Sequence, residues 1–413
     1  ETMFPVAASR LPVNRRRLGW VALACSAAGL AMGLSACGGG SRNSFFAPNS
    51  IVSFGDENSA FSDFTSPGLK LADGTTGASV RGFTYTVQSA TIGATVVCSN
   101  PPRPLQPGEV AADCGTTSNG GTLGSSPTTD YYTFSTVSST KLEADGTNQR
   151  TVTTAYNCAS ASNWVQVLAG AYGRGYNTQC PLEGRTGAIS YAAFGAQTAD
   201  VIAQIAAHRG ELNGSTLVTI MVGQNDILAQ YAIVRASGNP STAEAAAIAE
   251  LQARADRMAA AVKDVIGTGA KVVLSLTPSL NNSPKGVSVS EDGALLSRLV
   301  VAYNDRLYVR GLGNVSGRDL VGVNPDSFTN TSTRNTSYVH STALCNTTGL
   351  VKPDGTVTTG LEPDADANVR FCNTSITLNG STSTYIWADT IHYAPLGHSL
   401  IGSVAYNRAR QQL

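Results

Sequence analysis

The alternation of short apolar segments with longer amphipathic ones constrains the fold of this chain most strongly. Apolar segments of strand length lie at 51–54, 216–222 and 271–277. Apolar residues at helical spacing occur in a segment that begins at Asn163, at 196–208, 241–266 and 295–309, and from Pro395 onward. Short strands separated by helices are typical of a parallel sheet covered on both faces. The sequence therefore predicts an α/β fold with a mostly parallel sheet.

Glycine and polar residues follow the predicted strands. Gly55 and Asp56 come directly after the first strand, and Gly223 and Asn225 come after the second. Ligands of open parallel sheets bind beyond the carboxyl ends of the strands. The loop before Asp389 lies at such an end in the same arrangement, so we expect these loops to meet in one site.

Asp389 precedes His392 by three residues, in a chain with only 4 histidines. In a turn or a first helical turn, residues at this spacing share a face, so the carboxylate can accept a hydrogen bond from one imidazole nitrogen. The other nitrogen is then able to act as a base. A surface pair without a catalytic role is the alternative interpretation. We expect His398 to be structural, within the last helix.

Charge and length limit the classes of protein to consider. The 413 residues carry 28 Lys and Arg against 28 Asp and Glu, so the formal net charge is zero. No basic run occurs outside the N-terminus, which argues against nucleic acid as a partner. A chain of this length fits one large domain or two.

Residues 1–36 indicate a lipoprotein signal peptide rather than part of the fold. Three arginines at 15–17 precede an uncharged apolar run at 18–36, as in a secretory signal; a transmembrane anchor is the alternative. The run ends in Leu-Ser-Ala-Cys37, which resembles the bacterial lipobox. By that resemblance Cys37 is lipidated and becomes the first mature residue. Residues 37–50 then form the lipidated start and a flexible tether.

Six further cysteines follow Cys37. An even number in an exported chain favours disulfides, and proximity in the sequence favours local pairs, although other pairings are open. A metal site is disfavoured because no C-x-x-C occurs and the histidines lie far from the cysteines. The expected pairs are Cys98–Cys114, Cys158–Cys180 and Cys345–Cys372.

Four blocks of the chain, at 51–56, 190–196, 222–226 and 389–398, resemble those of the GDSL, or SGNH, esterases and lipases, in family order. The resemblance implies a flavodoxin-like three-layer α/β/α SGNH hydrolase fold. It spans about residue 51 to the C-terminus, so one hydrolase domain is expected at 51–413. Ser/Thr/Gly-rich and Asn/Thr-rich insertions interrupt it at about 66–155 and 311–385.

The resemblance also implies roles for single residues. His392 is the base and Asp389 orients it. The side-chain amide of Asn225 and the backbone N–H of Gly195 are the donors to the oxyanion, because ester hydrolysis needs such donors beside the nucleophile and base. No metal and no cofactor are implied. The G-x-S-x-G motif of the α/β-hydrolases does not occur.

The first block departs from the family pattern of Gly-Asp-Ser. Here Gly55-Asp56 is followed by Glu57, then Asn58 and Ser59. One interpretation treats two residues as inserted and makes Ser59 the nucleophile, which we favour. Another puts Glu57 in the nucleophile position, as a carboxylate nucleophile or as a substitution that silences the enzyme.

Two functions therefore remain open at this point. The first is a lipid-anchored or secreted esterase of the bacterial cell envelope, at the outer membrane. It would act on a lipid, an acetylated sugar or a polyester by a Ser-His-Asp mechanism. The second is a catalytically silent relative that binds glycans or envelope components. The intact set of Asp389, His392, Asn225 and Gly195 favours the first function, and Glu57 favours the second.

Overall fold

The computed structural model of the protein describes residues 45–65, 70–71, 79–87, 89–97, 121–123, 136–142, 149–329, 337–345, 372, 374 and 378–413. The chain divides into two compact units, Glu1–Phe45 and Phe46–Leu413. The second unit is described below. The predicted signal peptide, Cys37 and residues 38–44 of the predicted tether lie outside the described residues.

A parallel sheet of five strands forms the centre of the second unit. Its strands are β1 (Ser50–Gly55), β9 (Ala188–Ser190), β10 (Thr216–Met221), β11 (Lys271–Ser275) and β12 (Leu320–Val323). The order across the sheet is β12-β11-β10-β1-β9, and every neighbouring pair is parallel. The prediction of an α/β fold with a mostly parallel sheet is confirmed.

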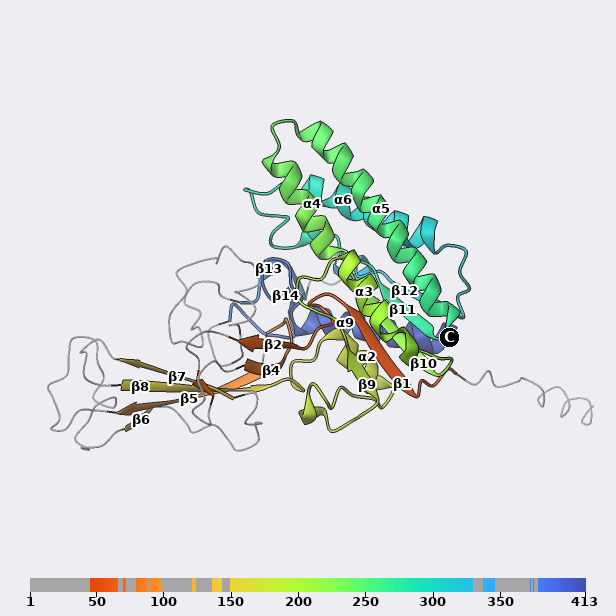
Figure 1. Ribbon diagram of the computed structural model, residues 1–413. Helices are drawn as coiled ribbons and strands as arrows, with labels where there is room; N and C mark the ends of the chain where they lie inside the picture. The colour runs from red at the N-terminus through yellow and green to blue at the C-terminus, as the bar shows by residue number, and fades with distance from the viewer. Residues whose placement is uncertain are drawn as a thin grey trace, which may run out of the picture. The chain divides into compact units, whose positions relative to one another are not determined.

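Helices cover both faces of this sheet (Figure 1). Val52 and Phe54 of β1 point into one core, and Ile51 points into the other. The first layer contains α3 (Thr198–His208), α4 (Gln224–Ala236), α5 (Pro240–Gly267) and α6 (Gly293–Asn304), and the second contains α2 (Trp164–Ala171) and α9 (Pro395–Gln412). Because side chains alternate along a strand, continuous apolar strands such as β1 require both layers to be buried.

The remaining elements are short. An antiparallel pair joins β2 (Ser62–Thr65) and β4 (Ser79–Phe83), and a parallel pair joins β13 (Val339–Ala343) and β14 (Tyr385–Trp387). An antiparallel sheet has the order β3 (Lys70–Leu71), β7 (Thr136–Leu142), β8 (Gln149–Asn157), β5 (Ser89–Val97), β6 (Gly121–Leu123). Single turns are η2 (Pro181–Glu183), η3 (Arg209–Glu211), η4 (Leu280–Asn282), η5 (Asp305–Gly311) and α7 (Asp326–Thr329). The boundaries of the two insertions stay a prediction.

Some local predictions differ from the structure. Alternating residues at 83–88 predict a half-exposed strand, but β4 ends at Phe83 and residues 84–87 form a loop in which every side chain is buried. The long helix begins at Pro240, not Ser241, and Asn239 caps it. Proline at the first helical position has a suitable φ and no N–H to satisfy, so the residue before it becomes the cap. The helix predicted at 295–309 is α6 followed by the π-helical turn η5.

Two of the three predicted disulfides are present. Cys158 is bonded to Cys180 and Cys345 is bonded to Cys372. Cys98 and Cys114 lie outside the described residues, so their pairing stays a prediction.

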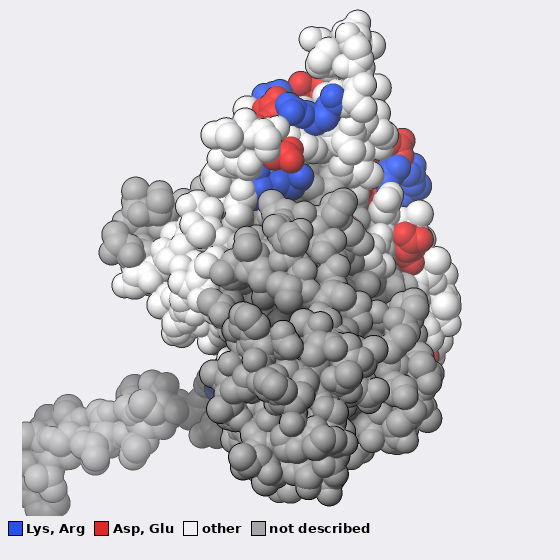
Figure 2. Space-filling model, turned by 90° about the vertical axis from the view of Figure 1, so that its left-hand side faces the viewer, with Lys and Arg blue, Asp and Glu red and all other residues white. Residues whose placement is uncertain are grey.

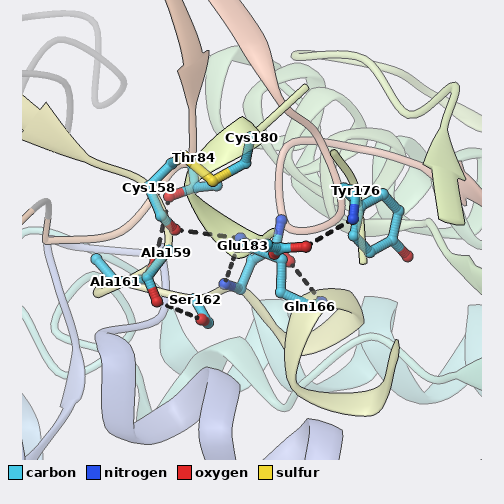
Figure 3. Close-up of a disulfide and its surroundings, with 10 residues drawn as sticks. Thr84, Cys158, Ala159, Ala161, Ser162, Gln166, Tyr176, Cys180 and Glu183 are labelled. Atoms are coloured by element: carbon cyan, nitrogen blue, oxygen red, sulfur yellow. Dashed lines mark hydrogen bonds between the residues drawn. A yellow bond between two sulfur atoms is a disulfide. The ribbon is translucent and has the colours of Figure 1, made fainter. Parts of the chain in front are cut away.

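The Cys158–Cys180 bridge lies beside the start of α2 (Figure 3). The side-chain amide of Gln166 donates one hydrogen bond to the carbonyl of Cys158 and another to the carboxylate of Glu183. Glu183 also accepts a hydrogen bond from the backbone N–H of Tyr176. Its pKa is raised, mainly by burial. The bridge and these bonds hold the chain that leaves β8 against α2.

Basic and acidic side chains lie next to one another on the described part of the face shown in Figure 2, without a large patch of one sign. Ion pairs also join neighbouring elements of the described chain, for example Arg306 of η5 and Asp256 of α5. No helix among the described residues is long and apolar enough to cross a membrane.

Candidate active site

The predicted site residues lie where the strand order of the sheet reverses. Numbered along the chain, the five strands lie in the order 2-1-3-4-5, which is the flavodoxin-like order. In such sheets the crevice for a ligand opens beyond the first and third strands, here β1 and β10. Glu57 follows the end of β1, and Asn225 follows the end of β10. The topology thus brings the first and third blocks of the sequence to one place.

Asp389 and His392 form the expected pair. Oδ2 of Asp389 lies 2.7 Å from Nδ1 of His392. Oδ1 of the same carboxylate accepts hydrogen bonds from the backbone N–H groups of Ile391 and His392, at 2.9 and 2.7 Å. Both side chains are buried. The carboxylate therefore fixes the turn and the imidazole together, and Nε2 of His392 is directed away from Asp389.

Glu57 is the group that faces this imidazole. Its Oε1 lies 3.8 Å from Nε2 of His392. Its Oε2 accepts a hydrogen bond of 3.1 Å from the backbone N–H of Gly195 and one of 2.8 Å from the side-chain amide of Asn225. The amide of Gln224 donates to Oε1 at 3.3 Å. The two donors expected to bind an oxyanion therefore bind the carboxylate of Glu57.

The backbone around these donors explains their position. Gly195 has a φ of +70°, in the left-handed region that favours glycine, and this conformation turns its N–H toward Glu57. Gly223 precedes α4 with a φ of +117°, and a Cβ there would lie 2.5 Å from the ring of Tyr303. Glycine at 223 thus allows α4 to start directly after the sheet, with Asn225 in its first turn.

Asp226 fixes the start of α4 to the neighbouring helices. Its buried carboxylate accepts hydrogen bonds from the backbone and hydroxyl of Thr198, at the start of α3, and from Arg254 of α5. Burial raises the pKa of Asp226 although these donors act in the opposite direction. Asp226 is therefore a positioning residue, which holds the segment with Gly195 and the segment with Asn225 at a fixed separation.

Ser59 has a different environment from Glu57. Its hydroxyl accepts a hydrogen bond of 3.0 Å from the indole N–H of Trp164, and its carbonyl accepts one from Ser190. A tight turn follows β1, because the N–H of Ser59 bonds to the carbonyl of Asp56 and the N–H of Ala60 bonds to that of Glu57. This turn directs Glu57 toward His392 and directs the hydroxyl of Ser59 toward α2.

Asp56 adds a second buried carboxyl group to the site. Its Oδ1 accepts two hydrogen bonds of 3.0 Å from Asn58. Its pKa is raised well above the usual value, first by burial and then by the negative charge of Glu57. Asp56, Glu57 and Asp389 thus place three carboxyl groups around His392, without a buried lysine or arginine among the described residues to offset them.

Aromatic rings cover the site on another side. The ring of Tyr85 lies 6.1 Å from that of His392 and stacks on Phe194 at 5.0 Å. The neighbouring Thr84 donates its hydroxyl hydrogen bond to the carbonyl of Ala161, close to the Cys158 disulfide (Figure 3). The loop at 84–87 therefore encloses the site.

Sequence reasoning did not find Gln224 or Tyr85. Gln224 stands at the variable position between Gly223 and Asn225, and only its distance to Glu57 gives it a role. Tyr85 lies in the segment predicted as a strand of an insertion, so nothing linked it to His392. The remaining expected site residues, Asp389, His392, Asn225 and Gly195, lie together as the order of the blocks indicated.

A family model described as GDSL-like lipase/acylhydrolase matches residues 122–404 of this chain, more than half of its length. The chain belongs to this family. The GDSL resemblance of the sequence is thereby confirmed. The matched range begins after the first block, so it does not cover the departure at Glu57. A search of curated proteins gives no match.

Solved structures that are similar to this chain include a phospholipase A1 and two lipases. A phospholipase A1 from Streptomyces albidoflavus is 23% identical, with a TM-score of 0.26, over 30% of this chain and 57% of that one. An extracellular lipase from Streptomyces rimosus is 15% identical, with a TM-score of 0.32, over 59% of this chain and 96% of that one. A lipase from a goat rumen metagenome is 14% identical, with a TM-score of 0.34, over 60% of this chain and 87% of that one. The chain thus spans little more than half of the first of these proteins.

Proposed function

We propose that this GDSL-family hydrolase cleaves carboxylic esters outside the cytoplasm, with Glu57 in the position of the nucleophile. One observation carries the proposal: Oε2 of Glu57 accepts hydrogen bonds from both Gly195 and Asn225, and Oε1 is the oxygen nearest His392. A group that attacks an ester carbonyl must lie beside the oxyanion donors and within reach of the base. Glu57 meets both requirements.

The chemistry follows from these positions. A carboxylate can act as a nucleophile without prior deprotonation. Attack by Oε1 of Glu57 on the ester carbonyl would give a tetrahedral intermediate, and Gly195 and Asn225 would shift from Oε2 to its oxyanion. Collapse would break the bond to the alcohol oxygen and leave the acyl group on Glu57 as an anhydride. The departing alcohol oxygen would take a proton from His392, so this step requires His392 to be protonated when the ester binds. His392, oriented by Asp389, would then remove a proton from the water that releases the acid.

Ser59 remains the alternative nucleophile within the same function. Attack by Ser59 requires its hydroxyl to leave the indole N–H of Trp164 and turn toward His392. The present geometry favours Glu57 over Ser59.

Hydrolysis of 4-nitrophenyl butyrate by residues 46–413 and by single variants tests the assignment. Glu57→Gln should lose turnover, because an amide is a poor nucleophile, while Ser59→Ala should keep it. His392→Asn should also lose turnover and should retain the acyl group, seen as added mass on the peptide that carries Glu57. Loss of activity in Ser59→Ala with full activity in Glu57→Gln would reverse the assignment.

The same contacts also support a second function, because they occupy the site with a side chain of the protein itself. The donors of the site already bind an internal carboxylate, and Glu57 and His392 are each only 1% exposed. This favours a catalytically silent relative that binds glycans or other envelope components. Absence of turnover with every short-chain ester, in a folded parent protein, would select this second function.

The proposed location outside the cytoplasm has separate support. Cys158–Cys180 and Cys345–Cys372 are disulfide-bonded, and such bonds persist in oxidising compartments. The lipobox-like sequence that ends at Cys37 suggests a lipid anchor in the bacterial envelope. Expression of the full chain in a bacterium tests this: Cys37→Ala should move the protein from the membrane fraction to the soluble fraction. Unchanged retention in the membrane would contradict the anchor.

A further inference from the structure

A pocket of about 600 Å³ opens beside the histidine loop. Ile391, the neighbour of His392, forms one part of its wall. Lys285, Ser290 and Glu291 form another part, and the backbone N–H of Lys285 bonds to the carbonyl of Thr390. Pockets that hold small ligands have volumes of about 300–1,000 Å³. The pocket therefore has the size of a ligand site and reaches the residue next to the base.

The third part of the wall is one face of α4. It consists of Leu228, Tyr231, Ala232, Arg235 and Ala236. These positions recur every three or four residues, which places them on one side of the helix, and Asn225 precedes Leu228 by the same interval. The oxyanion donor and the pocket thus share a helix face. At 1.5 Å per residue, Arg235 lies about 15 Å along the helix from Asn225.

Arg235 is the charge at the far end of this face. Lys285 lies 2.9 Å from the carboxylate of Glu291, so its charge is matched. The guanidinium of Arg235 donates to the carbonyl of Ser290 and lies over the ring of Tyr231 at 6.0 Å. In the described part of the chain no carboxylate lies within ion-pair distance of Arg235, which is exposed. The carboxylate of Glu291 also attracts Arg235, so two cations and one carboxylate of the pocket wall leave one positive charge for an anionic ligand.

We propose that this pocket binds one arm of the ester substrate, and that Arg235 recognises an anionic group at the far end of that arm. The inference rests on the proposed ester hydrolase function and specifies its substrate class. The arm is apolar along Leu228 and Ala232, and its carboxylate or phosphate lies about 15 Å from the scissile carbonyl. Arginine suits both anions, because its planar donors match their oxygens.

Binding of probes that cannot be hydrolysed tests the pocket without turnover. Decyl phosphate, decanedioate and decan-1-ol are titrated calorimetrically into residues 46–413, each below its micelle concentration. Arg235→Ala removes one charged hydrogen-bonded contact, so it should raise the Kd of the better-bound anionic probe about tenfold. The Kd of decan-1-ol should not change. Arg257→Ala is the control, because Arg257 is an exposed arginine of α5 outside the pocket wall. The two anionic probes distinguish a phosphate-bearing from a carboxylate-bearing substrate.

A kinetic comparison separates this inference from the proposed function. The parent should hydrolyse the 4-nitrophenyl half-ester of decanedioate with a higher kcat/KM than 4-nitrophenyl decanoate, and Arg235→Ala should remove the preference through KM. If no ester is cleaved but Arg235→Ala still weakens the binding of the anionic probes, the ligand pocket is supported and the hydrolase function is contradicted. Equal affinities of Arg235→Ala and Arg257→Ala for both anionic probes would overturn the inference.

Discussion

The side-chain amide of Asn225, a proposed donor to the oxyanion, donates a hydrogen bond of 2.8 Å to Oε2 of Glu57. The backbone N–H of Gly195 donates to the same oxygen. The two groups proposed to stabilise an oxyanion thus bind a carboxylate of the same chain. The consequences concern the stability of the fold as well as its chemistry.

Asn225→Ala should lower the free energy of unfolding by about 1–3 kcal/mol, because the buried carboxylate of Glu57 loses a donor. Asn225 also donates to the carbonyl of Ala196, so the single variant alone does not isolate the contact. Urea denaturation of Asn225→Ala in the parent and in Glu57→Ala gives the coupling between the two side chains. Equal costs in both backgrounds would show that Asn225 does not stabilise Glu57.

Asp56 should make the protein less stable as the pH rises. Its folded pKa is raised well above the usual value by burial and by Glu57. Its stabilising contribution is therefore complete below the unfolded pKa of about 3.9 and is lost as the pH rises through the folded pKa. Asp56→Asn keeps an acceptor for Asn58 and removes the ionisation.

Denaturation at pH 5 and pH 8 tests this dependence. The stability of Asp56→Asn relative to the parent should be greater at pH 8 than at pH 5. Asp305→Asn, at a partly exposed position of η5, is the control. A difference between Asp56→Asn and the parent that does not change with pH would refute the role of Asp56.

His398 should make the protein sensitive to acid. Its imidazole is fully buried, its Nδ1 accepts a hydrogen bond from the backbone N–H of Trp164, and burial lowers its pKa to about 3. The neutral form stabilises the fold fully above the unfolded pKa of about 6.5. That contribution is lost as the pH falls toward the folded pKa, by up to about 1.4 kcal/mol per pH unit.

His398→Asn retains a short acceptor and does not titrate. Between pH 7 and pH 4.5 it should therefore lose less stability than the parent, as measured by urea denaturation. Parallel pH profiles for His398→Asn and the parent would contradict the buried neutral state of His398.

Much of the fold could be predicted because its signals are local. The segments at 51–54, 216–222 and 271–277 are continuous apolar runs, and only a sheet with two covered faces buries such strands. Asp389 and His392 lie three residues apart, and this spacing alone allows a carboxylate to orient an imidazole. Those expectations needed no knowledge of distant residues.

Two of the errors depend on contacts between distant segments. Helix α4 was not among the predicted helices; the positive φ of Gly223 lets it start directly after the sheet, beside Tyr303. The segment at 83–88 alternates as a strand would, but Tyr85 is buried against Phe194 and His392. Alternation of apolar and polar residues indicates the local periodicity of the backbone, but it does not indicate which distant segments bury a side chain.

The identity of the nucleophile could not be decided from sequence for the same reason. Whether two additional residues carry Ser59 to His392 depends on how the chain turns after β1. The turn at Asp56 and Glu57 directs the hydroxyl of Ser59 to Trp164, which lies far away in the sequence. The order of the blocks therefore indicated which segments meet, and the turn determines which side chain enters the site.

Mapping of fluorophosphonate adducts by peptide mass spectrometry tests the central claim most directly. A fluorophosphonate reacts with a serine that lies beside a base and oxyanion donors. The parent should remain unlabelled, Glu57→Ser should be labelled at position 57, and the double variant Glu57→Ser/His392→Asn should again be unlabelled. Labelling of the parent at Ser59, abolished by Ser59→Ala, would contradict the placement of Glu57 in the nucleophile position.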